Sequence, residues 1–279
     1  MKGTFLNNVK RPIPAILLGI SLLLSAIEWR NQFTSTPMGE NKLAINELFD
    51  PSFKRLTSLS ACIQYCDSNF KYLLVSQKDT FSYVNFVAEF IKKRFYHGYS
   101  YFRPGYNTIG WMAAPILHKD LSATVIPDDI LKFPHGACSQ QSIIFFELLQ
   151  KKGLPTRKVG FFDSTTQGGH FASEVYWGGK WHYYDVNKEP DVTILERMGR
   201  PSFDEVYMTP GLVDSVYRNA DVSAGLFKNH FYGKPNEPLA PNATIYHRIT
   251  KFISLTLPIW VLLTIWIWGL LSRRNMKSV

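Results

Sequence analysis

A run of 20 uncharged residues near the C-terminus, Phe252 to Leu271, constrains the fold of this chain more than any other feature. About 20 apolar helical residues cross the hydrocarbon core of a bilayer, whereas a buried core helix of that length normally keeps a polar stripe. Trp266 and Trp268 are typical of a membrane–water interface, and Pro258 is tolerated in lipid. The run therefore predicts a transmembrane helix over 252–271.

A second apolar run, Ile13 to Trp29, lies near the N-terminus and contains one charged residue, Glu28. It is close to the lower limit for a span, about 17 residues. The pattern favours a transmembrane anchor over 12–29. A cleavable signal peptide is the alternative, because Leu24-Ser25-Ala26 offers small residues for cleavage, although no clear Ala-x-Ala end follows.

The net charge of +9 is concentrated outside these two runs. The tails 1–11 and 272–279 each carry three basic residues and no acidic one, which leaves +3 over 12–272. Such a distribution argues against a nucleic-acid partner. By the positive-inside rule both tails are cytoplasmic, so 30–250 is predicted to form an extracytoplasmic domain of a two-pass membrane protein.

Within that domain, Cys138 opens a segment with the apolar spacing of a helix. Gly153 and Pro155 predict where the helix ends. Unpaired N–H groups and the dipole at a helix N-terminus favour a thiolate and lower the thiol pKa from about 8.5. The alternative is a buried structural cysteine, because free cysteine is among the most buried residue types.

A tight β-hairpin is predicted further along, with strands at 170–177 and 180–186 joined by a two-residue Gly-Gly turn. In the register set by that turn, His170 and Asp185 are diagonal neighbours on one face, about 7–8 Å apart at the backbone. Their side chains are then within reach of each other. Asn187 lies opposite His170 in this register and is a rival for the role of orienting it.

The order of these residues is the one that a thiol nucleophile, its base and the orienter of that base require. Over 135–187 the chain resembles the transglutaminase-like superfamily, a papain-like cysteine fold. The matching motifs are Gly136-Ala137-Cys138, Gly153-Leu154-Pro155-Thr156-Arg157, His170 with Glu174-Val175, and Gly179-Lys180-Trp181 with Asp185. The resemblance implies an α+β core in which a helix bearing the nucleophile Cys138 packs on an antiparallel sheet bearing the base His170 and the orienter Asp185. Ala172 departs from the family, which often has tryptophan there.

The function that the resemblance implies is that of a membrane-anchored cysteine acyl-transfer enzyme acting on protein or peptide amides, as a protease, deamidase or transglutaminase. It needs neither a cofactor nor a metal. One alternative is a catalytically inert extracytoplasmic binding or assembly module of a cell-envelope glycan or secretion system. Another is a metal site formed by Cys138, His135 and His170, although no ligand-spacing signature supports it.

Other residues near these positions are candidates for supporting roles. Trp111 or Asn107 is a candidate oxyanion donor upstream of the nucleophile. Gln140 and Gln141, in the first predicted helical turn, either contact substrate or form ordinary helix surface. Glu174 is expected to be a solvated strand carboxylate, with lining of the substrate groove or pairing with Lys180 as the alternatives.

Upstream, the apolar spacing predicts a helix over Thr80–His97, capped by Thr80 and packed under the Cys138 helix. A short helix is predicted over Lys42–Phe49, and 99–131 reads as irregular because of its prolines. Cys62 and Cys66 are either packed thiols or a disulfide, which a regular helix accommodates poorly at this spacing.

Overall fold

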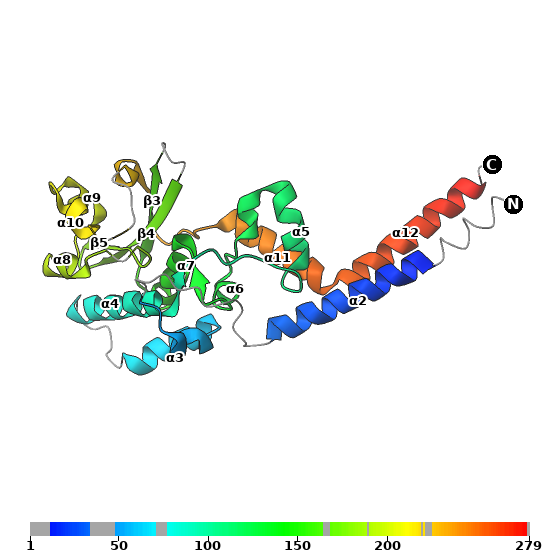
Figure 1. Cartoon of the computed structure of the whole chain (residues 1–279), viewed down its shortest axis with the longest axis horizontal. Coiled ribbons are helices and arrows are strands. Elements are labelled where there is room, and N and C mark those ends of the chain that lie inside the picture. The colour runs from blue at the N-terminus through cyan, green and yellow to red at the C-terminus, as the bar shows by residue number, and fades with distance from the viewer. Residues whose placement is uncertain are drawn as a thin grey trace. The chain divides into compact units, whose positions relative to one another are not determined.

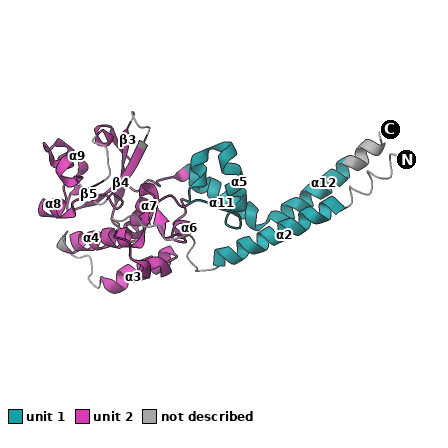
Figure 2. Cartoon of the chain, in the orientation of Figure 1, with its two compact units in different colours: residues 1–34, 101–124, 242–279 teal, residues 35–100, 125–241 magenta. Residues whose placement is uncertain are grey.

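The computed structural model describes residues 12–33, 48–70, 77–163, 168–188, 190–218, 220 and 225–277. The chain falls into two compact units (Figure 2). Unit 1 comprises 1–34, 101–124 and 242–279, and unit 2 comprises 35–100 and 125–241. The segment 30–250, predicted as one domain, is therefore shared between the units, because 101–124 groups with the two terminal segments.

Unit 2 combines helices with a four-stranded antiparallel sheet of strand order β5-β4-β3-β6 and a separate parallel pair, β1-β2 (Figure 1). Its strands are β1 (Tyr96–His97), β2 (His135–Gly136), β3 (Thr156–Asp163), β4 (Gly168–Trp177), β5 (Lys180–Tyr184) and β6 (His230–Tyr232). Its helices are η1 (Pro51–Arg55), α3 (Leu59–Asn69), α4 (Gln77–Arg94), α6 (Pro127–Ile130), α7 (Cys138–Gln150), α8 (Val192–Arg197), α9 (Phe203–Met208), α10 (Leu212–Val216) and η3 (Leu226–Lys228). The predicted α+β class with an antiparallel sheet is confirmed.

The β4–β5 hairpin has the predicted register. Trp177 is paired with Lys180 across the Gly178-Gly179 turn, and Ser173 is paired with Tyr184 further up the ladder. Both turn glycines have positive φ, 58° and 83°, as the primed two-residue turns require. The turn chemistry thus fixes which β4 residues share a face with the residues that follow β5.

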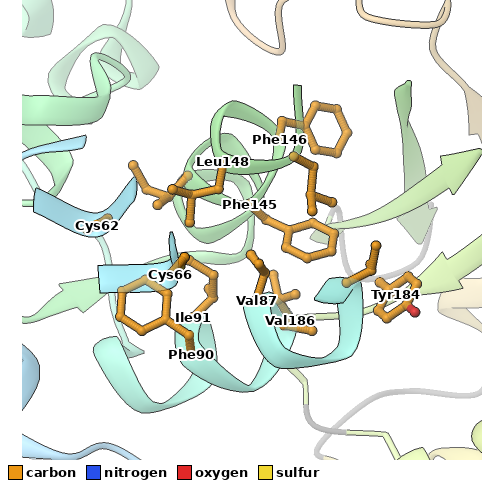
Figure 3. Close-up of a cluster of buried hydrophobic side chains, with 14 of the residues drawn as sticks. Cys62, Cys66, Val87, Phe90, Ile91, Phe145, Phe146, Leu148, Tyr184 and Val186 are labelled. Atoms are coloured by element: carbon orange, nitrogen blue, oxygen red, sulfur yellow. The ribbon is translucent and has the colours of Figure 1, made fainter. Parts of the chain in front are cut away.

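The larger hydrophobic core of unit 2 lies between α7 and α4, as predicted (Figure 3). Val87, Phe90 and Ile91 of α4 and Phe145 and Leu148 of α7 are almost completely buried. Each such side chain contributes about 1.5–3 kcal/mol by leaving water. The helix that carries Cys138 is therefore held by its own apolar face.

Two boundaries of α4 differ from the prediction. The helix begins at Gln77 rather than being capped by Thr80, which is buried within it. Asp79 in the first turn suits the positive end of the helix dipole. The helix ends at Arg94 instead of His97, because Tyr96 and His97 form β1 and pair with β2.

Cys62 and Cys66 lie on α3 as free, buried thiols of the same core. Of the two predicted alternatives, packed thiols are therefore found rather than a disulfide. Burial raises the pKa of each thiol to about 12. Neither is therefore a reactive thiolate at neutral pH. The third cysteine, Cys138, differs from both, because its pKa lies below the ordinary value.

In the part of unit 1 that the structure describes, the named elements are helices, and two isolated β-bridges, Tyr101–Ala123 and Arg103–Tyr106, lie in the segment 101–124. The helices are α2 (Pro12–Phe33), α5 (Thr108–Leu117), η2 (Lys119–Ser122), α11 (Pro241–Leu255) and α12 (Leu257–Lys277). One of them, α2 near the N-terminus, is long and apolar enough to span a membrane. α11 and α12 meet that test only when taken together.

The helix predicted over 252–271 is interrupted near its start, since α11 and α12 meet at a bend of 74°. Pro258 explains the break, because proline lacks the N–H that would bond the carbonyl of Ser254 and its ring clashes with that carbonyl. Two donors of α2 replace the missing bonds. Ser25 Oγ donates to the Ser254 carbonyl at 3.0 Å, and Trp29 Nε1 donates to the Leu255 carbonyl at 3.1 Å.

The segment 99–131 is not irregular throughout, because it contains α5. Asn107 caps this helix by accepting a hydrogen bond from the Gly110 N–H, 3.1 Å away. Pro115 lies near the C-terminal end of the helix, where it interrupts few backbone bonds. The predicted helix over Lys42–Phe49 falls largely outside the described residues, and its last two positions are not helical.

Candidate active site

Cys138 is the first residue of α7, as the sequence predicts. Gln140 fixes the chain just before it: its Oε1 accepts the N–H groups of Ala137 and Ser100, and its Nε2 donates to the Ser100 carbonyl. Gln141 Nε2 donates to the Gly136 carbonyl at 2.8 Å. Both glutamines are buried rather than ordinary helix surface. Their hydrogen bonds indicate that they position the backbone around the thiol.

His170 on β4 and Asp185 just after β5 form a buried pair. His170 Nε2 donates to Asp185 Oδ2 over 2.7 Å. Asp185 Oδ1 accepts the N–H groups of Asn187 and Lys188, each at 3.0 Å. Both oxygens are thus held, and the predicted contact between the two side chains is confirmed.

Asn187, the predicted rival, does not orient His170 through its side chain. Its Nδ2 lies 3.1 Å from His97 Nδ1, and its backbone N–H donates to Asp185 Oδ1. The β4–β5 ladder ends at Tyr184, so the chain turns away before Asn187 comes opposite His170.

Two tyrosines missed by sequence reasoning extend the pair. Tyr217 donates to Asp185 Oδ2 at 2.9 Å, and the Tyr183 and Tyr217 hydroxyls lie 2.5 Å apart. Burial holds the pKa of both phenols well above the ordinary value, so each keeps its proton for donation. Tyr183 was detectable, since it lies two residues before Asp185 on the same strand face. Tyr217 lies far along the chain with no local signal.

The electrostatics of the three side chains favour a thiolate–imidazolium pair. Burial raises the pKa of Cys138, but the hydrogen bond and charge of His170, with the Phe171 N–H, outweigh it and hold that pKa below its ordinary value. Burial lowers the pKa of His170, but the Asp185 charge outweighs it and raises that pKa well above 6.5. Burial raises the pKa of Asp185, and the charge and hydrogen bond of His170 instead lower it to about 2.

The orientation of the His170 imidazole fits a thiolate–imidazolium pair with Cys138. Nε2 is taken by Asp185, so Nδ1 is the nitrogen left for the thiol. Nδ1 is buried and has no nitrogen or oxygen partner among the described residues, and the Cys138 thiol is the polar group that acts on it. The Phe161 ring from β3 stacks on the imidazole with its centroid 5.9 Å away. Cys138 is only 7% exposed, so small reagents are the suitable probes of its chemistry.

The remaining candidates have other partners. Trp111 and Asn107 belong to α5 and its N-terminal cap in unit 1, whereas Cys138 belongs to unit 2. His135 Nδ1 lies 3.2 Å from the Tyr96 hydroxyl. In the part of the chain that is described, no three His, Cys, Asp or Glu side chains converge to hold a metal ion.

Glu174 is not the solvated carboxylate that the sequence predicts, because it is completely buried. Arg157 Nε donates to one of its oxygens at 2.6 Å, and the N–H of Phe203, at the start of α9, donates to the other at 2.7 Å. Burial still raises the pKa of Glu174 despite these partners. The residue therefore joins β3, β4 and α9, and its ion-pair partner is Arg157 rather than Lys180.

Comparison of the chain with protein-family models, curated proteins and solved structures finds no match.

Replacing Tyr217 by phenylalanine tests its part in the site. We expect Tyr217→Phe to alkylate at Cys138 up to about tenfold more slowly at pH 6, because a hydrogen bond to a charged group contributes about 1.5–3 kcal/mol. Without this hydrogen bond the Asp185 carboxylate is less stable as an anion, so it stabilises the His170 imidazolium less. The imidazolium in turn stabilises the Cys138 thiolate less. The pH below which the alkylation rate falls therefore moves upward. Iodoacetamide rates across pH measure this, with the exposed Tyr207→Phe as matched control. An acid limb identical in both variants would show that Tyr217 only packs.

Proposed function

We propose that the chain is a membrane-anchored cysteine acyl-transfer enzyme with a transglutaminase-like, papain-like core in unit 2. The observation that carries the proposal is the buried Cys138–His170–Asp185 arrangement, in which the thiol pKa is lowered and the imidazole pKa is raised. A packed structural cysteine has the opposite electrostatics, as Cys62 and Cys66 of the same unit illustrate.

In the proposed reaction, the Cys138 thiolate attacks the carbonyl carbon of a carboxamide or peptide and forms a C–S bond. N–H groups of the first turn of α7, which have no partner within the helix, stabilise the oxyanion. The His170 imidazolium gives its proton to the leaving nitrogen as the C–N bond breaks, which leaves a thioester. Neutral His170 then takes a proton from water or from an amine that attacks the thioester, and the thiolate is restored.

Asp185 keeps the imidazole in one orientation throughout this cycle. Its carboxylate receives four hydrogen bonds, two on each oxygen, so it cannot rotate without breaking some of them. The charge of Asp185 stabilises the imidazolium that donates to the leaving nitrogen. Water as acceptor gives hydrolysis or deamidation, and an amine gives crosslinking.

For the membrane part, we propose that α2 and the α11–α12 pair form two membrane passes with both basic tails in the cytoplasm. The charge of the tails supports this topology by the positive-inside rule. Unit 2 is then extracytoplasmic. The donors of Ser25 and Trp29 at the bend support the pairing of α2 with the C-terminal helices, since free carbonyls in an apolar setting are costly.

The acyl-transfer proposal is tested with p-nitrophenyl acetate and the full chain in detergent, followed by peptide mass spectrometry. We expect an acetyl thioester on Cys138 that forms within the dead time of manual mixing and decays faster when a primary amine is added. The adduct is expected to be absent in Cys138→Ser and at least about 100-fold slower in His170→Ala, in keeping with a positioned acid–base group. Cys62 and Cys66 are internal controls, because both are buried thiols.

Acetylation confined to lysines, or equal rates in the wild type and His170→Ala, would contradict the proposal. That outcome favours the alternative, an inert extracytoplasmic binding or assembly module that keeps the same side chains.

A further inference from the structure

The helices of unit 1 bury small or polar side chains and expose large apolar ones. The buried positions are Ser21, Ser25 and Glu28 on α2, Thr108, Gly110 and Ala114 on α5, and His247, Thr250 and Ser254 on α11. In a water-soluble unit the apolar stripe of each helix faces inward. Small and polar residues at helix contacts are typical of helices packed in lipid. The pattern includes α5 and the part of α11 before Phe252, to which the sequence assigned no place in the membrane.

α5 is fixed to α2 through a buried carboxylate. Glu28, with no exposed surface, accepts the N–H groups of Asn107 and Thr108 and the Thr108 hydroxyl. The Ile109 N–H donates to Ser254 Oγ of α11 at 2.9 Å, so α5 is attached to both segments. The helix therefore begins level with Glu28, near the C-terminal end of α2.

The free surface of α5 is apolar. The helix has no charged residue, and its most exposed side chains are Trp111, Met112, Ile116 and Leu117. Ile116 is 84% exposed, so its branched aliphatic side chain makes little contact with the rest of the unit. α2 likewise exposes large apolar side chains, among them Ile16, Leu22 and Leu23. A surface of this kind is costly in water and suits the apolar zone of a bilayer.

α11 has the pattern of a helix that lies along a membrane surface. Ile245, Ile249 and Phe252 are exposed and recur at intervals of four and three residues on one face. The opposite face packs in unit 1 through the buried polar residues His247, Thr250 and Ser254. Arg248 and Lys251 lie beside the apolar face and suit lipid phosphates. The bend of 74° from α12 places α11 close to the bilayer plane if α12 crosses it.

The length of α12 supports the same placement of α11 near the membrane surface. The apolar part of α12, Leu257–Leu271, is about 22 Å long at 1.5 Å per residue. In a hydrocarbon core about 30 Å thick, roughly 8 Å of depth is then not spanned by α12, and we place this depth at the end where the bend lies. Interfacial helices bury their apolar face about 5–10 Å into the boundary between headgroups and acyl chains. α11 and α5, which meet α2 at the bend, fill that depth.

We propose that α5 and α11 form an interfacial platform, defined by the exposed side chains of these two helices, that is seated in the headgroup–acyl boundary of the bilayer on the side of the bend. The occupant of its apolar face is lipid. The platform adds two half-buried helices to the two passes and fixes the depth at which the chain leaves the membrane. This inference rests on the two-pass topology proposed above and is independent of the acyl-transfer chemistry.

The test uses the full chain in nanodiscs of phosphatidylcholine and phosphatidylglycerol, with a fluorescent label on single new cysteines in a Cys138→Ala background. The labelled positions are Met112→Cys on α5, Ile249→Cys on α11, Leu23→Cys on α2 and Asp214→Cys on α10. All four are exposed, so the label disturbs little packing. Lipids with a spin label at a shallow acyl position quench labels at the interface, and aqueous iodide quenches labels in water.

We expect shallow spin-labelled lipid to quench the labels at Met112 and Ile249 at least about threefold more than the label at Asp214, and iodide to show the reverse order. The label at Leu23 tests the membrane anchor separately. Lipid quenching at Leu23 with strong iodide quenching at Met112 and Ile249 would overturn the platform and keep the anchor. Protection from both quenchers at Met112 and Ile249 would indicate a protein or a second copy on this face and would also overturn it. A variant that unfolds at lower temperature than its parent is replaced by Ile116→Cys or Ile245→Cys, which are exposed on the same faces.

Discussion

Replacing His170 by alanine is expected to lower the rate of Cys138 alkylation by iodoacetamide about 10- to 100-fold at pH 6. In the wild type, the imidazolium stabilises the thiolate, so the thiol pKa lies below its ordinary value. Without His170, burial becomes the dominant influence and raises that pKa. An ordinary thiol, with a pKa of about 8.5, is ionised in roughly one molecule in 300 at pH 6, which sets the scale of the loss.

The direction of the pH dependence follows from the two partners. The thiolate is protonated as the pH falls through the lowered pKa of Cys138, which gives the acid limb. The imidazolium loses its charge only as the pH rises through its raised pKa, about 10. The charged pair therefore spans neutral pH, and wild-type alkylation is expected to change little there. In His170→Ala the rate should instead climb steadily through neutral pH.

A matched control is available three residues before the nucleophile. His135→Ala removes an imidazole that contacts Tyr96 and is outside the Cys138–His170–Asp185 arrangement. Its alkylation profile should retain the acid limb of the wild type. If His170→Ala and His135→Ala gave the same profile as the wild type, Cys138 would be an ordinary thiol and the nucleophile assignment would fail.

Local sequence rules predicted the parts of the site that depend on local geometry. The Gly-Gly turn fixed the β4–β5 register and so the reach between His170 and Asp185. The helix α7 follows from the apolar spacing after Cys138, and its end follows from Gly153, which has the positive φ of a helix end. These are relations between residues a short distance apart in the chain.

The errors arose where a distant segment decided the outcome. Glu174 resembled a solvated strand carboxylate until Arg157 and the start of α9 surrounded it. Tyr217 reaches Asp185 from 32 residues away, so no spacing rule indicates it. The break in the helix predicted over 252–271 was not foreseen, because donors on α2 make the bend before Pro258 tolerable. Hydropathy alone detects apolar length but not the partner that completes a broken helix.

Arg94→Met is expected to destabilise unit 2 by about 3–5 kcal/mol, the largest stability effect that we predict. Arg94 lies fully buried at the end of α4. Its guanidinium donates to three backbone carbonyls: Leu56, through Nε and Nη2, and Leu131 and Phe133. A buried polar group without a partner costs about 1–3 kcal/mol, and methionine leaves all three carbonyls without this donor.

The measurement is the urea midpoint for hydrogen exchange of the α7 amides, which reports on unit 2 alone. Arg197→Met is the matched control, since that arginine is exposed and its removal should change stability by less than about 0.5 kcal/mol. Arg94→Lys should fall between the two, because a lysine ammonium keeps the charge but cannot reproduce the planar fork that reaches three separate carbonyls. Leu131 and Phe133 belong to the segment that leads into β2 and Cys138, so the same hydrogen bonds stabilise the approach to the nucleophile. Equal midpoints for Arg94→Met and Arg197→Met would show that water or a rearranged backbone replaces the guanidinium at little cost.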